Sequence, residues 1–77
     1  MNPDKLPSIS RLLTKELATR DMSQRSLAKL IGLSNSQVSR LIRNTHPPKR
    51  RTLMLLSKYF KLPYRNLAIS AAIHSQA

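Results

Sequence analysis

The hydrophobic positions of this chain recur with a helical period. No segment of strand length alternates apolar and polar residues between turn signals, so the pattern predicts an all-α protein. The first predicted helix begins at Ser8 or Pro7 and breaks at 20–22, and its apolar stripe follows the spacing i, i+3, i+4, i+8. The apolar members of this stripe are Ile9, Leu12, Leu13 and Leu17.

Two shorter helices follow, with a stop between them. Ser23 stands just before an apolar-periodic run and suits an N-cap, because its hydroxyl can accept from a free N–H of the first turn. Gly32 directly follows Ile31, which indicates a left-handed residue that ends the second helix. Ser34 is the next N-cap candidate, and Asn44 can end the third helix because Asn tolerates a positive φ.

Prolines separate the third helix from the last two. Residues before a proline leave the α region, so 46–48 cannot continue a helix. The fourth helix is predicted to start near Lys49, and Pro63 to be the first residue of the fifth. We therefore expect a compact five-helix bundle, with 1–7 as a flexible N-terminal arm and 8–74 as one domain. The positions of the last two helices that should face inward are Leu53, Leu56, Tyr59, Phe60 and Leu67.

Composition and charge restrict the partners. The 77 residues allow one small domain with a thin core, because a chain of this size buries only roughly 60% of the surface that its unfolded form exposes. Fourteen Lys and Arg face three acidic residues, and the resulting net charge of +11 attracts polyanions such as nucleic acid. No run of about 18 apolar residues could span a membrane, and the start of the chain lacks the apolar segment of a signal peptide. A cytoplasmic protein is expected.

Metal, cofactor and catalytic chemistry are not expected. Cysteine is absent, and His46 and His74 lie far apart in the sequence, whereas a zinc site needs three or four ligands. The sequence contains no acid pair, nucleophile–base set or phosphate-binding loop, so an enzyme is not expected either.

Residues 23–44 combine the features of a helix-turn-helix motif, in which a short turn containing glycine joins two helices. Ala28 is small where the helices must approach, and Gly32 makes the turn. Val38 and Leu41 should pack the second helix of the motif onto the first. The outer face of that second helix is rich in amide, hydroxyl and guanidinium groups, which suits contact with DNA.

The run 23–41, SQRSLAKLIGLSNSQVSRL, resembles the helix-turn-helix of the lambda-repressor-like family (Cro/C1-type, XRE family). This resemblance implies a small, sequence-specific transcriptional regulator of the phage or mobile-element repressor type, acting in a bacterial or phage-infected cell. Such a protein would place the helix 34–44 in the major groove of double-stranded DNA. The resemblance covers nearly the whole chain, continuing through Pro48, Leu53, Leu56, Phe60, Leu62 and Leu67.

The resemblance also implies which residues contact DNA. An Asn amide can pair with adenine N6 and N7, an Arg with guanine O6 and N7, and a Ser with either kind of partner. The candidates for base contact are Asn35, Ser36, Gln37, Ser39 and Arg40. The candidates for phosphate contact are Gln24, Arg25, Ser34, Arg43, Asn44, Thr45, Lys49, Arg50 and Arg51.

The sequence is compatible with more than one oligomeric state and with more than one function. Ile69, Ala72 and Ile73 form an apolar ridge that either pads the first helix or makes a homodimer seam. A two-fold dimer would bind a palindromic operator with half-sites about 34 Å apart. The alternative function is an antitoxin-type interaction protein that binds a toxin and autoregulates its operon. Nonspecific binding of RNA or an anionic membrane, driven by charge alone, is a third possibility.

Overall fold

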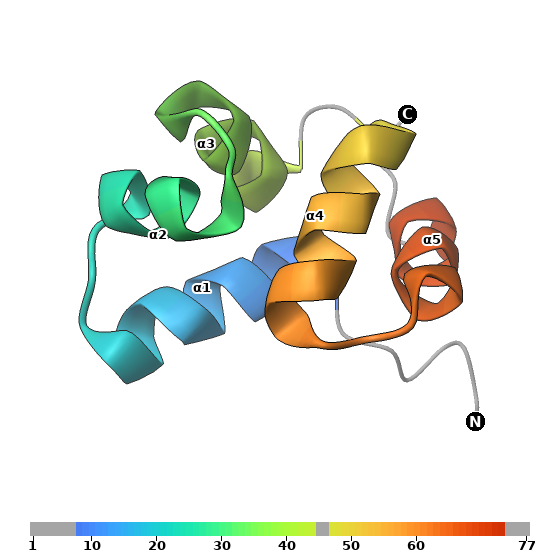
Figure 1. The fold of residues 1–77 in the computed structure, drawn as a ribbon, viewed down its shortest axis with the longest axis horizontal. Helices are drawn as coiled ribbons and strands as arrows, with labels where there is room; N and C mark the ends of the chain where they lie inside the picture. Colours follow the sequence, from blue (N-terminus) through green and yellow to red (C-terminus); the bar gives the residue numbers. More distant parts are fainter. Residues whose placement is uncertain (1–7, 45–46, 74–77) are drawn as a thin grey trace.

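Five helices make up the part of the chain that the computed structural model describes, residues 8–44 and 47–73. Their bounds are α1 Ile9–Arg20, α2 Gln24–Ile31, α3 Asn35–Arg43, α4 Arg50–Phe60 and α5 Tyr64–Ile73. Figure 1 shows α2 and α3 above α1, with α4 beside them and α5 on the far side of α4. The all-α prediction is confirmed, while the predicted arm 1–7 and both histidines, His46 and His74, lie outside the described residues.

Serine hydroxyls define where the first three helices begin. Ser8, Ser23 and Ser34 each have an extended backbone, and each hydroxyl accepts from the backbone N–H three residues later at 3.1 Å. These bonds pair N–H groups of the first turn that no helical carbonyl can reach. The two N-caps predicted at Ser23 and Ser34 are confirmed.

Left-handed residues end four of the helices. Gly32 ends α2 with φ 97°, and Asn44 ends α3 with φ 55°, as their residue types predicted. Asp21 and Lys61 adopt the same conformation after α1 and α4, with φ 52° and 57°. Each of the four backbone N–H groups returns to a carbonyl of the last helical turn, which closes the helix end.

The start of the fifth helix differs by one residue from its prediction. The helix begins at Tyr64 rather than at Pro63. Pro63 occupies the position just before the helix, where its carbonyl accepts from the N–H of Asn66 at 3.0 Å and of Leu67 at 3.4 Å. The ring of Pro63 therefore precedes the first turn, and its carbonyl satisfies two of the N–H groups in that turn.

The core lies where all five helices meet. Leucines from four helices are fully buried in it, and each contributes roughly 1.5–3 kcal/mol by leaving water. Tyr59 and Phe60 are only half buried at its edge, with ring centroids 5.0 Å apart in an edge-to-face arrangement. Among the described residues, no helix is long and apolar enough to cross a membrane. The largest fully buried side chains are Leu13, Leu27, Leu56, Leu67, Val38 and Ser70.

Candidate nucleic-acid interface

Helix α3 lies at one end of the molecule with one face packed and the other exposed. Val38 and Leu41 are buried against α1 and α2, with Val38 at 0% exposure. Ser36, Arg40 and Arg43 lie on the opposite face and are exposed. Figure 1 shows α3 as an outer element, reached by the short turn that follows α2. The packing seam predicted from Val38 and Leu41 is therefore present, and it leaves the polar face of α3 open.

The first turn of α3 is organised by a reciprocal pair of hydrogen bonds. The N–H of Gln37 donates to the hydroxyl of Ser34 at 3.1 Å, and the N–H of Ser34 donates to Oε1 of Gln37 at 2.8 Å. This is a capping box. Because a backbone N–H can only donate, the amide oxygen of Gln37 is the bonded atom, and its NH2 group remains as a donor. The Ser-x-x-Gln spacing is the sequence signal for a capping box. Ser34 was predicted as the N-cap, whereas the reciprocal bond to Gln37 was not predicted.

The far end of α3 is tied to α1. The hydroxyl of Ser10 donates to the carbonyl of Ile42, a bond that links two helices distant in sequence. Ile42 itself is half buried against the core. Asn44 then ends the helix, and its N–H donates to the carbonyl of Leu41 at 3.2 Å. Both ends of α3 are thus held, which fixes the direction of its outer face.

A groove of about 560 Å³ runs between α3 and the segment that leads into α4. Gln37 and Arg40 line it from α3, and Lys49 lines it from the opposite side together with Pro47. Two cations therefore face one groove from both walls. Thr45, the phosphate-contact candidate at the other end of this connection, lies outside the described residues.

The basic run 49–51 is divided between two sides of α4. Arg51 lines a smaller groove of about 230 Å³ with Gly32 and Gln37, next to the turn between α2 and α3. Arg50 lines a different groove, with Tyr64 from α5. The structure therefore brings Lys49 and Arg51 toward α3 and separates Arg50 from them.

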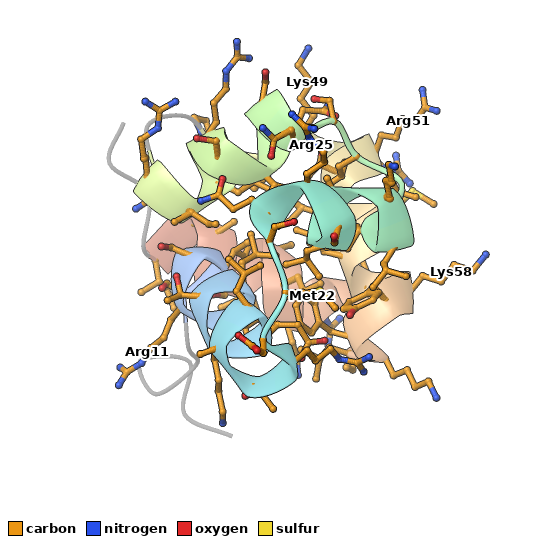
Figure 2. The ribbon with its side chains drawn as sticks, turned by 90° about the vertical axis from the view of Figure 1, so that its left-hand side faces the viewer. Arg11, Met22, Arg25, Lys49, Arg51 and Lys58 are labelled. Carbon is orange, nitrogen blue, oxygen red and sulfur yellow. The ribbon has the colours of Figure 1, made fainter. Side chains whose placement is uncertain are left out.

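The candidates on α2 extend the same end of the molecule. Gln24 is the first residue of α2 and is half buried, whereas Arg25 next to it is exposed. In Figure 2, Arg25, Lys49 and Arg51 are labelled in the upper part of the molecule, while Arg11 extends from its lower left. Basic side chains from α2 and α4 therefore flank α3, whose own arginines were described above.

Comparison with known families agrees with this geometry. A family model described as helix-turn-helix matches residues 13–67, from within α1 to α5. The chain belongs to the Cro/C1-type helix-turn-helix (XRE) family. Neither the curated proteins nor the solved structures contain a match to it. The resemblance inferred from the sequence is confirmed, and the protein is a DNA-binding transcription regulator of this type.

Apart from Arg20, the cations of this helix-turn-helix regulator form no ion pair within the described part of the chain. Its one ion pair there joins Arg20 to Glu16 at 3.2 Å, between successive turns of α1. Asp21, the other acid in the described ranges, ends α1. The charge around α3 is therefore available to a polyanion.

The apolar ridge of α5 is partly open in this helix-turn-helix regulator. Ile69 is half buried, whereas Ala72 and Ile73 are exposed, Ile73 at 42%. The ridge is therefore open at Ala72 and Ile73, and both the padding of α1 and the dimer seam stay predictions. Metal-ligating side chains do not gather in groups of three or more within 8–44 and 47–73.

Proposed function

We propose that this regulator recognises a specific double-stranded DNA sequence by placing α3 in the major groove. The observation that carries the proposal is the exposed face of α3, held from behind by buried Val38 and Leu41 and tied at its end by Ser10. A recognition helix must be rigidly mounted and must present polar groups outward, and α3 meets both requirements.

Four of the five base-contact candidates are exposed, on the outer face of α3 or in its first turn. Arg40 and Ser36 project from the outer face, and Asn35 is exposed at the first helical position. Arg40 can grip guanine through O6 and N7, and Asn35 can pair with the N6 and N7 edge of adenine. Ser39 is half buried, so its hydroxyl reaches less far. Gln37 offers its NH2 group to a base acceptor while its oxygen stays in the capping box.

The phosphate-contact residues surround α3. Basic and amide groups at such positions set the register of a protein on the duplex without discriminating between sequences. Arg50 is left out of this set, because it lines a groove on the α5 side of α4. Thr45 remains a candidate from the sequence alone. The described members of the set are Gln24, Arg25, Ser34, Arg43, Asn44, Lys49 and Arg51.

We infer further that the protein is a repressor of the phage or mobile-element type that acts as a homodimer on a palindromic operator. Bound near a promoter, it would exclude RNA polymerase. The exposed Ala72 and Ile73 at the end of α5 support a dimer seam with Ile69, because isolated apolar groups gain by leaving water. A dimer would also double the contacts made by one small domain.

Selection of bound duplexes from a random library tests base recognition directly. A palindromic consensus is expected from the unaltered chain. Arg40→Ala should weaken binding to that consensus by about 1–3 kcal/mol and relax the preference at one base pair. Arg11→Ala is the matched control, since Arg11 is exposed on α1 and points away from α3 (Figure 2). Equal loss on consensus and random duplexes with Arg40→Ala would show that this side chain does not discriminate between bases.

The salt dependence of binding separates phosphate contacts from base contacts. Lys49→Ala and Arg51→Ala should each weaken binding to all duplexes. Each should also reduce the steepness of the slope of log affinity against log salt concentration by about 0.9, the value for one lost phosphate contact. Arg11→Ala should leave the slope unchanged. A slope that stays constant in both Lys49→Ala and Arg51→Ala would remove these two residues from the interface.

A further inference from the structure

The groove that Arg50 and Tyr64 line runs along α4 and the start of α5, and the DNA-binding proposal does not use it. It has a volume of about 380 Å³ and is lined by Arg50, Met54, Ser57, Lys58 and Tyr64. Met54 is 55% exposed and Tyr64 37%, and they are two of the four large hydrophobic side chains that are exposed in the described residues. Because Met54 and Tyr64 line the same groove, a partner that covers it would remove both apolar side chains from water together.

Three of the lining residues form a line on one face of α4. Arg50, Met54 and Lys58 are four residues apart, and all three are exposed. With a rise of 1.5 Å per residue, the two cations are about 12 Å apart along the helix, and the methionine lies midway. Tyr64 provides an aromatic wall from α5. The groove therefore presents an apolar centre with a positive charge on each side.

Ser57, which also lines this groove from α4, is held in place. The hydroxyl of Ser57 donates to the carbonyl of Leu62 at 2.5 Å, and the N–H of Leu62 donates to the carbonyl of Ser57 at 3.1 Å. These two bonds connect the last turns of α4 to the segment before α5. The hydroxyl hydrogen of Ser57 is thereby engaged within the chain, so the charges and the apolar side chains remain as the recognition features.

We infer that this groove docks an acidic amphipathic helix of a partner protein. The complementary helix carries one large apolar residue, with an Asp or Glu four positions before it and another four positions after it. The apolar residue covers Met54 and contacts Tyr64, while the two carboxylates pair with Arg50 and Lys58. Such charge pairs at the rim set the register and raise the association rate, and the buried apolar contact supplies most of the affinity.

A second copy of this chain does not fit the groove. A two-fold contact would bring Arg50 and Lys58 of both copies together, with no acid among the lining residues to offset them. Glu16 is paired with Arg20 on α1, and Asp21 ends that helix. Like charges placed opposite each other at an interface cost on the order of several kcal/mol of binding free energy, which is enough to prevent such a contact. An acidic partner removes this repulsion.

Duplex DNA is not the occupant either. Its backbone offers phosphates and sugars but no large apolar side chain that could fill the space between Met54 and Tyr64. The groove shares no lining residue with the two grooves next to α3, which Gln37, Lys49 and Arg51 line, so a partner here does not need to contact the proposed DNA-binding residues. A partner docked here would therefore join the regulator on DNA rather than replace it.

Methyl NMR of the full chain with labelled methionines tests the proposal. The probe is a synthetic helical peptide with the pattern Glu-x-x-x-Leu-x-x-x-Glu on one face, and its control is a scrambled peptide of equal composition. The Met54 methyl signal should shift saturably with the first peptide only. Met22, which packs against the core, is an internal reference that should not move. Equal shifts with the scrambled peptide would mean that only bulk charge is sensed, and the proposal would fail.

Matched variants test each element of the groove. Met54→Gln should weaken peptide binding at least tenfold, whereas Leu30→Gln should not change it, since Leu30 is 56% exposed on α2 and lines none of the three grooves described above. Lys58→Glu should weaken binding similarly, and a peptide with Lys in place of the facing Glu should bind this variant better than it binds the unaltered chain. Unchanged melting temperatures establish that the variants are folded.

Three results would overturn the inference. The first is unchanged peptide affinity in Met54→Gln. The second is a concentration-dependent Met54 shift without peptide, together with self-association in sedimentation, because the groove would then be a contact between copies of this chain. The third is an equal Met54 shift with duplex DNA, which would make the groove part of the nucleic-acid interface.

Discussion

Replacing Gln37 with Glu separates the two roles that this residue has in α3. In the free protein, its Oε1 accepts from the N–H of Ser34 at 2.8 Å, and its NH2 group remains as a donor. Gln37→Glu retains an oxygen for the cap and removes the donor. Gln37→Ala removes both. The two variants therefore share the loss of the amide donor and differ in the capping box.

The expected stability changes have opposite signs. A carboxylate at the N-terminus of a helix gains about 0.3–1 kcal/mol from the helix dipole at an exposed position, and Gln37 is exposed. Gln37→Ala loses its half of the capping box, which costs about 0.3–1.5 kcal/mol. For a domain of this size, 1 kcal/mol corresponds to roughly 4–8 °C in Tm, so the two variants should melt on opposite sides of the unaltered chain.

The expected change in DNA preference follows from the lost donor. A bound NH2 group favours an acceptor on a base edge, such as O6 or N7 of guanine, N7 of adenine or O4 of thymine, whereas a carboxylate accepts from an amino group, such as N4 of cytosine. Gln37→Glu should therefore change the preferred base at one pair, by about 1–3 kcal/mol of discrimination. Thermal unfolding and duplex selection from a random library measure both quantities on the same samples. Destabilisation of Gln37→Glu to the level of Gln37→Ala would refute the capping argument, and an unchanged consensus would refute the donor argument.

Three further changes test the fold. Gly32→Ala should cost about 1–2 kcal/mol in urea unfolding, because φ is 97° there, and a much smaller loss would mean that the turn relaxes. Burial, with the Glu16 carboxylate nearby, raises the pKa of Tyr59 above its usual 10. The folded chain then holds this proton more tightly than the unfolded chain does. The contribution of Tyr59 to the free energy of unfolding is therefore full below pH 10 and is lost as the pH rises through the raised pKa. Tyr59→Phe should flatten this decline, and parallel profiles for the two chains would contradict the assignment. Ser10→Ala should cost about 0.5–1.5 kcal/mol by removing the donor to Ile42, whereas an unchanged unfolding midpoint would show that this bond adds nothing.

Much of the fold could be predicted because residues next to each helix end determine where the helix begins and stops. Serine before an apolar stripe and glycine or asparagine after it act within one turn, so Ser23, Gly32, Ser34 and Asn44 could be assigned without knowing the tertiary structure. The same locality applies to the inward positions of α2, where the helical period alone identifies the buried face.

Residue type and tertiary packing limited the rest of the prediction. Lysine has no preference for a positive φ, so its residue type could not indicate that Lys61 ends α4, although the bonds between Leu62 and Ser57 that accompany this end are local. The run 49–51 looks uniform as a string of charges, and its division between two sides of α4 depends on where that helix is packed. The base-contact assignments are likewise predictions, since they depend on a bound duplex.

The shortage of acidic residues around α3 affects how this regulator is distributed between the free state and DNA. The described part of the chain has one ion pair, so few internal ion pairs have to break before its cations can contact phosphate. Nonspecific dissociation constants of proteins on duplex DNA are typically about 10⁻⁴–10⁻⁶ M at physiological salt. Where duplex is abundant, most molecules would be held on unrelated sequence and few would diffuse freely. Occupancy of an operator would then depend on the ratio of specific to random affinity and on the amount of competing DNA.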